Sequence, residues 1–296
     1  MPLIETEHLG HIYAPGTHFE ITALDDVSLN IEKGEFYALV GATGSGKTTM
    51  VQHFNGLLAP TSGRLRVCDI EITGKNAGRG LWRKVGLVFQ QPEHQLFEET
   101  VALDVAFGPR NLGLPSAQVD KRVIEAMEMV GLEPDQVGSL PPLQLSGGLR
   151  RKVAIAGVLA LQPEVLVLDE PAAGLDPVSR NQLFGQLDRL RFEKGMTVVL
   201  VTHNMEDVAR WAGRMAVLHK GRLVMEGSPR EIFGQGASLR PYGLDVPAAV
   251  EMMRLLKAGG LTVSSGALTV DEAVEEIITA LGERNVIEAT EKERLK

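Results

Sequence analysis

The chain has 296 residues, 44% of them hydrophobic, and a formal net charge of −8 with a sequence pI near 5.5. This length suits one large domain with a small appendage, and the hydrophobic content is ample for a packed core. The acidic balance argues against a nucleic-acid binder that relies on basic phosphate contacts and against direct docking on anionic lipid headgroups. The longest apolar stretch, residues 153–161, is too short to span a bilayer, so insertion into lipid is not expected.

The N-terminal region is expected to form short antiparallel strands. Residues 1–5 lack the basic region and apolar run of a signal peptide. Over residues 3–31, apolar and polar types alternate around turn residues such as Pro15 and Gly16. The single cysteine, Cys68, cannot form an internal disulfide, which favours a reducing, cytosolic compartment.

A glycine-rich loop follows, between the apolar run 36–40 and the helical stretch 49–54. In this strand–turn–helix order, successive backbone N–H groups can point at one anion, and the helix start adds its positive dipole end. Lys47 would reach the β- and γ-phosphates of a nucleoside triphosphate, and the Thr48 hydroxyl would ligate Mg²⁺. The alternative is a glycine-rich turn with a chance lysine. The predicted phosphate-binding residues are Gly41, Ala42, Thr43, Gly44, Ser45, Gly46, Lys47, Thr48 and Thr49.

Beyond this loop, apolar runs alternate with helical stretches up to about residue 218. Strands this apolar are usually buried on both faces, as in a parallel sheet flanked by helices. The expected strands are 36–40, 85–89, 165–168, 197–201 and 215–218, and helical spacing covers 120–130 and 178–190.

Residues 145–148, Leu-Ser-Gly-Gly, precede another helical stretch. Its free amides form an anion site without a lysine. One nucleotide does not need two such sites far apart in sequence. Ser146, Gly147 and Gly148 could therefore serve the γ-phosphate of a nucleotide on a second molecule, although many helices start this way.

Two strands end in residues suited to phosphate hydrolysis. In a parallel sheet the strand C-termini border the ligand crevice, where Asp169 can hold Mg²⁺ through water and Glu170 can orient or deprotonate the attacking water. An ordinary acidic turn is the alternative for these carboxylates. His203 follows the strand 197–201 and is expected at the same edge of the sheet. An imidazole there could contact a γ-phosphate or have a structural role.

The C-terminal part is expected to be a small α-rich domain. Residues 234–245 resemble a linker, and 246–296 follow with a helix at 247–257. A second helix has Thr269 as N-cap and Glu272 as the partner of a capping box, and runs to about Leu281 before a charged, frayed tail.

Taken together, these motifs resemble the ATP-binding cassette family over residues 1–233: the phosphate loop, Gln90, 145–148, Asp169 with Glu170, 174–176 and His203, in that order. The resemblance implies an α/β fold: a phosphate-loop NTPase core with a mostly parallel sheet, an N-terminal antiparallel β subdomain and a helical subdomain over about 91–161.

The same resemblance implies ATP and Mg²⁺ as ligands, sandwiched between two cassettes that close head to tail. Ser146, Gly147 and Gly148 of one cassette would cap the ATP on the other. Gln90 would contact Mg²⁺ and water and take part in catalysis with Glu170 and His203. Asp176 would lie in the loop that crosses the dimer, and Tyr13 would stack on adenine.

A narrower resemblance, to the ATPases of energy-coupling factor transporters, lies in residues 88–97, 104–109 and 111–114. Residues 14–20 and 154–160 are similar to the second of that family's two paralogous ATPases, in vitamin and cobalt uptake systems. The implied partners are a paralogous cassette, a transmembrane coupling protein and a substrate-binding membrane subunit, with the chain peripheral on the cytoplasmic face of the membrane. A C-terminal dimerisation domain is also implied. Candidate contacts to the coupling protein are Glu93, Glu98 and Glu99, which could instead be a solvated acidic loop.

One position departs from the family pattern, because Leu149 stands where glutamine is usual after Ser-Gly-Gly. Backbone amides and the serine hydroxyl bind phosphate, so we expect the site to survive. The main alternative function is that of a soluble cassette ATPase that acts in cofactor assembly or on nucleic acid. A phosphate-loop kinase or GTPase of another family is the other alternative. The transported cargo is not encoded in a cassette, and the choice between homodimer and heterodimer stays open, with the resemblance favouring the latter.

Overall fold

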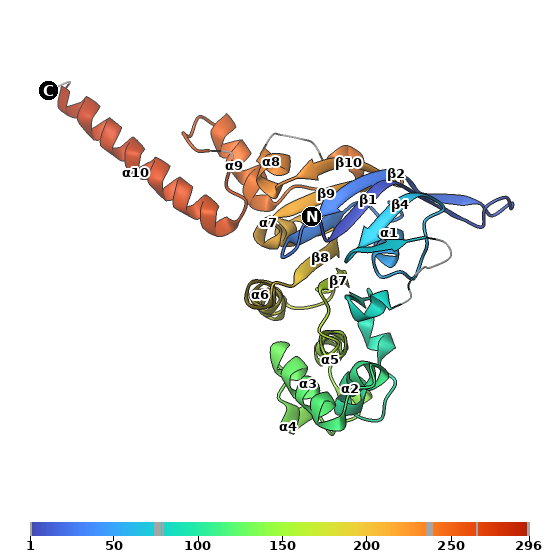
Figure 1. The fold of residues 1–296 in the computed structure, drawn as a ribbon. Helices are drawn as coiled ribbons and strands as arrows, with labels where there is room; N and C mark the ends of the chain where they lie inside the picture. The colour runs from blue at the N-terminus through green and yellow to red at the C-terminus, as the bar shows by residue number, and fades with distance from the viewer. Residues whose placement is uncertain (1, 74–77, 79, 235–238, 265, 295–296) are drawn as a thin grey trace.

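The computed structural model describes residues 2–73, 78, 80–234, 239–264 and 266–294, except for the side chains of 93, 94 and 283–294. In the view of Figure 1, two sheets lie in the upper part of the molecule and a group of helices lies below them. The α/β fold class expected from the sequence is confirmed.

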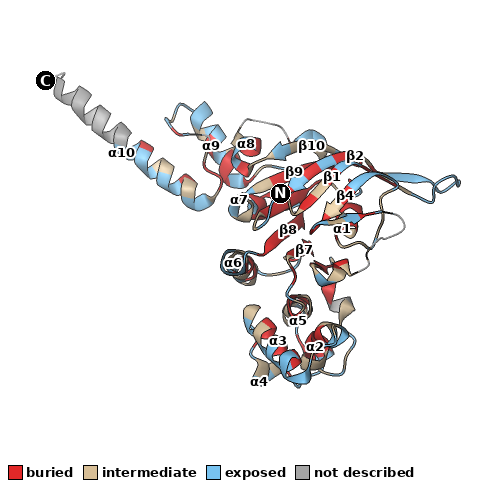
Figure 2. Cartoon of the chain, in the orientation of Figure 1, coloured by how far each residue is buried: buried red, intermediate tan, exposed pale blue. Residues whose placement is uncertain are grey.

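The central sheet has the strand order β10-β9-β3-β8-β7-β6. Strands β9, β3, β8, β7 and β6 run parallel, and β10 pairs antiparallel with β9. All residues of β3, β6, β7 and β8 are buried, which agrees with their largely apolar sequences. Figure 2 shows β8 in the colour of buried residues. The strands are β3 (Phe36–Val40), β6 (Val85–Val88), β7 (Val165–Asp169), β8 (Thr197–Thr202), β9 (Arg214–His219) and β10 (Arg222–Gly227).

A second, antiparallel sheet has the order β2-β1-β4-β5. One apolar cluster joins it to the central sheet and to helix α1, with members such as Leu9, Tyr37 and Phe54. Packing against both sheets therefore fixes the helix that follows the phosphate loop. The elements are β1 (Ile4–Tyr13), β2 (Ile21–Ile31), α1 (Lys47–Phe54), β4 (Ser62–Val67) and β5 (Ile70–Ile72).

Helices cover the other face of the central sheet. A second cluster joins α2, α3, α5 and α6 to inward-facing residues of β7 and β8, such as Leu168 and Leu200. Helices α2 to α5 fall within the predicted helical subdomain, whose boundaries remain a prediction. The elements are η1 (Leu81–Arg83), η2 (Pro92–Gln95), α2 (Val101–Asn111), α3 (Ser116–Met129), α4 (Pro134–Val137), η3 (Pro142–Gln144), α5 (Gly147–Leu159), α6 (Pro177–Lys194) and α7 (Met205–Trp211).

The C-terminal segment packs against side chains of β3, β9 and β10. In the predicted linker, residues 235–238 lie outside the described residues, and the described remainder buries Leu239 and Leu244 in a cluster with Phe233 and Val250. The elements here are α8 (Pro229–Gly234), η4 (Arg240–Tyr242), α9 (Ala248–Ala258) and α10 (Val270–Arg294).

Helix α10 begins at the predicted N-cap, Thr269, but the Glu272 carboxylate binds the N–H one residue before it and not that of Thr269 itself. The Thr269 hydroxyl accepts the Glu272 N–H at 3.3 Å, and the Glu272 carboxylate accepts the Leu268 N–H at 2.8 Å. The helix continues to Arg294, beyond the expected end near Leu281. Residues 283–294 contain no proline or glycine and are rich in good helix formers, which explains the extension. Among the described residues, no helix combines the length and hydropathy needed to cross a bilayer.

Candidate active site

The glycine-rich loop connects the end of β3 to the start of α1, and its backbone requires glycine at two positions. Gly46, the N-cap of α1, has φ 104°, and a Cβ there would lie 2.6 Å from the carbonyl oxygen of Ala23. A Cβ at Gly41 would lie 2.3 Å from the carbonyl oxygen of Leu218. The loop therefore wraps closely against neighbouring backbone, with the amides of the α1 N-terminus at its open end.

Lys47 folds back over this loop. Its Nζ donates to the carbonyl oxygens of Gly41 at 2.7 Å and Ala42 at 3.0 Å. Burial lowers the pKa of Lys47, while the carboxylates of Glu170 and Asp169 act to raise it. The ammonium group is thus held at the centre of the loop, where it would meet a bound anion.

The Ser45 hydroxyl supports the same conclusion. Its Oγ is buried, and within the described part of the chain it makes no hydrogen bond. Leaving a buried hydroxyl unpaired costs free energy, so such a group requires an explanation. A phosphate oxygen in the loop could accept this hydrogen bond, and the residues present therefore suit a nucleotide phosphate.

Thr48 and Asp169 form the next pair, which joins α1 to the end of β7. The Thr48 hydroxyl donates to Oδ2 of Asp169 at 3.1 Å. Burial raises the pKa of Asp169, and the Thr48 hydrogen bond opposes that rise. These two oxygens could ligate a divalent cation. The described residues contain no group of three or more His, Cys, Asp or Glu arranged for a metal, so such a cation would also need ligands from the nucleotide or water.

Glu170 and His203 meet where β7 and β8 end. Oε1 of Glu170 accepts the His203 backbone N–H at 3.0 Å and lies 2.6 Å from His203 Nδ1. The Thr202 hydroxyl donates to the other carboxylate oxygen at 3.4 Å. Glu170 has φ 51°, uncommon for a residue with a Cβ, whereas the His203 side chain is exposed. The strand ends thus unite the two residues predicted to handle water and the γ-phosphate.

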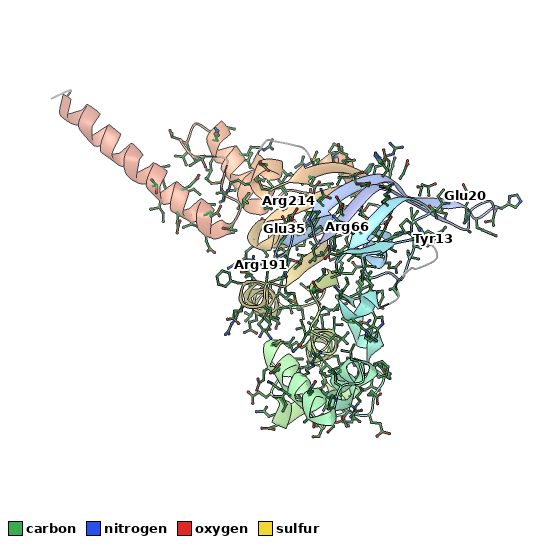
Figure 3. The ribbon with its side chains drawn as sticks, in the orientation of Figure 1. Tyr13, Glu20, Glu35, Arg66, Arg191 and Arg214 are labelled. Carbon is green, nitrogen blue, oxygen red and sulfur yellow. The ribbon has the colours of Figure 1, made fainter. Side chains whose placement is uncertain are left out.

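Gln90 and Tyr13 border the site from other elements. Val88 of β6 pairs with Leu168 of β7, and Gln90 and Glu170 each lie two residues beyond this pair, past the ends of these neighbouring strands. Gln90 is exposed. Figure 3 labels Tyr13, at the end of β1. Its hydroxyl lies 3.2 Å from the Thr49 hydroxyl, which attaches the end of β1 to α1.

The remaining predicted residues lie at two other helix starts, and the structure does not bring them to the chain's own phosphate loop. Ser146 caps α5, its hydroxyl accepting the Leu149 N–H at 3.4 Å, and Gly147 and Gly148 form the first turn. Asp176 caps α6 by accepting the N–H groups of Val178 and Ser179, both at 3.0 Å. Ser146, Gly147 and Asp176 are exposed, as a contact with a second molecule requires.

Sequence reasoning missed several contacts of the site. An Arg151 guanidinium N–H donates to the Ala173 carbonyl oxygen, which ties α5 to the loop before Asp176. Thr202 supports Glu170, and two buried histidines, His11 and His53, lie behind Tyr13. No sequence signal identifies these contacts, because they join distant segments through residue types with many other uses.

A phosphate loop on a parallel sheet, an acidic strand end with a neighbouring histidine, and a Ser-Gly-Gly helix start on a separate helical part define the class of ATP-binding cassette ATPases. A family model described as ABC transporter matches residues 24–173. The chain belongs to this family and, within it, to the ATP-binding proteins of energy-coupling factor transporters.

Curated relatives support the narrower assignment. The chain is 48% identical over 276 residues to the energy-coupling factor transporter ATP-binding protein EcfA2 of Clostridium tetani, a match covering 93% of this chain and 96% of the relative. It is 50% identical over 285 residues to EcfA2 of Symbiobacterium thermophilum, covering 96% and 98%.

Solved structures support the fold. CbiO1 from Clostridium perfringens, described as part of the ABC transporter complex CbiONQ, matches with a TM-score of 0.72 and 36% identity, covering 81% of this chain and 94% of that one. The cassette MJ0796, in a dimeric post-hydrolysis state bound to ADP and Pi, matches with a TM-score of 0.68 and 32% identity, covering 77% and 99%.

Proposed function

We propose that the chain binds and hydrolyses ATP as a subunit of an energy-coupling factor transporter that imports vitamins or metal ions. The observation that carries this proposal is the Glu170–His203 pair beside the Lys47 loop, in a chain nearly half identical to named transporter ATPases over almost its whole length. The chain would act at the cytoplasmic face of the membrane, held there by protein partners.

The residues of the site would share the tasks of hydrolysis. Residues 41–49 would hold the phosphates, with Lys47 turning from its loop carbonyls towards the β- and γ-phosphates. Thr48, Asp169 and Gln90 would hold Mg²⁺, which would neutralise phosphate charge in the transition state. Glu170 would accept a proton from, or orient, the attacking water, and His203 would contact the γ-phosphate.

Closure of two cassettes would complete each site. Ser146, Gly147 and Gly148 would present the α5 N-terminus to the ATP held by the partner, with Asp176 beside them. The exposure of Ser146, Gly147 and Asp176 supports this role. Since only ATP carries the γ-phosphate, ATP and not ADP would stabilise the closed pair. We propose a paralogous cassette as the partner.

A surface on the helical part would contact the transmembrane coupling protein. Phe97 and Phe107 are exposed, with ring centroids 4.8 Å apart in an edge-to-face arrangement. Asp104 holds the segment beside them by accepting the N–H groups of Phe97 and Glu98, both at 3.0 Å. Exposed aromatics beside Glu98 and Glu99 suit an apolar helix with basic residues. The side chain of Glu93, the third candidate, lies outside what the structure describes.

The C-terminal segment would contribute to pairing. Helix α10 exposes four apolar side chains spaced by four, four and three residues, which places them along one side of the helix. They are Val270, Val274, Ile278 and Leu281. A second helix packed along this stripe would remove it from water.

Co-purification tests the proposed function. The tagged chain is expressed with a multi-span membrane protein encoded beside it, and the complex is extracted in detergent. We expect a stable complex whose ATPase activity depends on Glu170. An active ATPase that never associates with the membrane protein would instead favour a cassette outside transport.

A further inference from the structure

Two buried histidines lie in direct contact behind the nucleotide site. His53 is 0% exposed and His11 is 7% exposed. Nε2 of His53 lies 3.1 Å from Nδ1 of His11, and the ring centroids are 4.7 Å apart. Buried imidazoles carry polar atoms that need partners, so this pair must be organised by its hydrogen bonds.

The surrounding carbonyl groups determine which nitrogens carry protons. Nδ1 of His53 lies 2.7 Å from the Thr49 carbonyl oxygen, which can only accept, so His53 carries its proton on Nδ1. Nε2 of neutral His53 is then an acceptor. Nδ1 of His11 must therefore donate to it, and the same N–H also points to the Ala59 carbonyl oxygen at 3.2 Å.

This pair leads directly to Tyr13. The His11 and Tyr13 rings are 4.5 Å apart and meet edge to face at 75°. The Tyr13 hydroxyl lies 3.2 Å from that of Thr49, the residue whose carbonyl binds His53. The tyrosine ring is thus held from two sides, and with 38% of the residue exposed it still offers a surface to a ligand.

We propose that His11, oriented by His53, is a positioning residue for the adenine end of the nucleotide site, and that it acts on base binding through the ring of Tyr13. This inference rests on the proposed function and on the adenine-stacking role that the family resemblance implies for Tyr13. His11 and His53 do not touch the nucleotide. Their effect is to hold the tyrosine ring in the orientation that an adenine requires. The contact of Tyr13 with Thr49 fixes the ring relative to the helix that follows the phosphate loop.

Comparing ATP with inorganic tripolyphosphate tests the proposal, because tripolyphosphate has no base. Affinities are measured by calorimetry on the full chain in excess EDTA, which prevents turnover. The variants are His11→Ala, His53→Leu and Tyr13→Ala. The control is Thr6→Val, which also changes a buried polar residue of β1. The Thr6 hydroxyl accepts the Leu29 N–H at 2.9 Å.

We expect His11→Ala to lower the affinity for ATP about three- to tenfold, which corresponds to the interaction energy of one aromatic pair. The affinity for tripolyphosphate should change less than about twofold. His53→Leu should lower the ATP-to-tripolyphosphate affinity ratio in the same direction, and Thr6→Val should leave it unchanged. If His53→Leu does not fold, His11→Ala alone decides.

An unchanged ratio in His11→Ala, or equal weakening of both ligands, would overturn the proposal, and so would an unchanged ratio in Tyr13→Ala. Failure of the wild-type chain to bind ATP at all would instead overturn the proposed function. The two failures are therefore distinguishable.

Discussion

The Glu170 carboxylate accepts the backbone N–H of His203 at 3.0 Å and lies 2.6 Å from the Nδ1 atom of its ring, although 33 residues separate the two in sequence. One oxygen of the proposed base is therefore engaged by the residue expected to contact the γ-phosphate. The other oxygen accepts only the longer bond from Thr202, at 3.4 Å. A shift of the His203 ring towards a phosphate would remove the 2.6 Å contact and leave this oxygen bonded only to the backbone N–H, with a lone pair available for water.

Replacing Glu170 with glutamine should separate binding from hydrolysis. The amide keeps the size of the side chain but cannot accept a proton, so ATP should bind and hold the cassettes closed. Turnover should fall by at least about a hundredfold, a typical effect of losing a general base. Phosphate release and size-exclusion chromatography with ATP measure the two effects. Turnover at the wild-type rate would remove Glu170 from the role of base.

Replacing Lys47 with alanine should weaken nucleotide binding itself. The ammonium group now donates to two loop carbonyls and would donate to phosphate oxygens, so its loss should lower ATP affinity by on the order of tenfold to a hundredfold. Calorimetry measures the change, and Lys121→Ala, at an exposed lysine of α3, is the matched control. Equal affinities in both variants would contradict this role for Lys47.

The sequence predicts much of this site because its parts are local. The phosphate loop, Asp169, Glu170 and His203 all lie at strand ends, where a parallel sheet aligns them. His11 and His53 could not be predicted as a pair, because one lies in a strand and the other in a helix 42 residues later. The predicted end of α10 near Leu281 is also wrong, because the charged residues beyond it have high helix propensity and continue the helix to Arg294.

The buried His53 predicts a pH dependence of stability. Burial lowers its pKa to about 4 in the folded protein, against an ordinary value of 6.5. Below pH 6.5 His53 of the unfolded chain binds a proton, whereas His53 of the folded chain stays neutral down to about pH 4. The free energy of unfolding is therefore unaffected by this group above pH 6.5 and decreases by about 3 kcal/mol as the pH falls towards 4.

Urea unfolding at pH 7.5 and pH 4.5 measures this loss. His53→Gln is the comparison, because glutamine does not titrate in this range while all other groups are kept. The wild-type protein should lose more stability between the two pH values than the variant loses. Identical losses in both proteins would show that His53 is not the titrating group.

Restoring glutamine at Leu149 should leave ATP affinity of the single chain unchanged. Leu149 packs against the apolar cluster of the helical part and lines a cavity of about 210 Å³ between α5 and α6, together with Leu175. Glutamine there should cost about 1 kcal/mol of unfolding free energy through lost apolar burial. Calorimetry and urea unfolding measure the two quantities. A large change in affinity would mean that residue 149 acts on the chain's own nucleotide.

Reversing the charge of Glu99 should disrupt assembly and spare nucleotide binding. Glu99 is exposed beside Phe97, on the segment that Asp104 holds through two backbone N–H groups, so a substitution there leaves the support of the segment intact. If basic side chains of the coupling protein face this segment, Glu99→Lys places like charges together and should reduce co-purification several-fold, more strongly at low salt.

Glu71→Lys makes the same change on the exposed side of β5 and should not affect assembly. ATP affinity should be unchanged in both variants. Normal assembly of Glu99→Lys would exclude an electrostatic contact at this position and leave the exposed Phe97 and Phe107 as the remaining candidates for the interface.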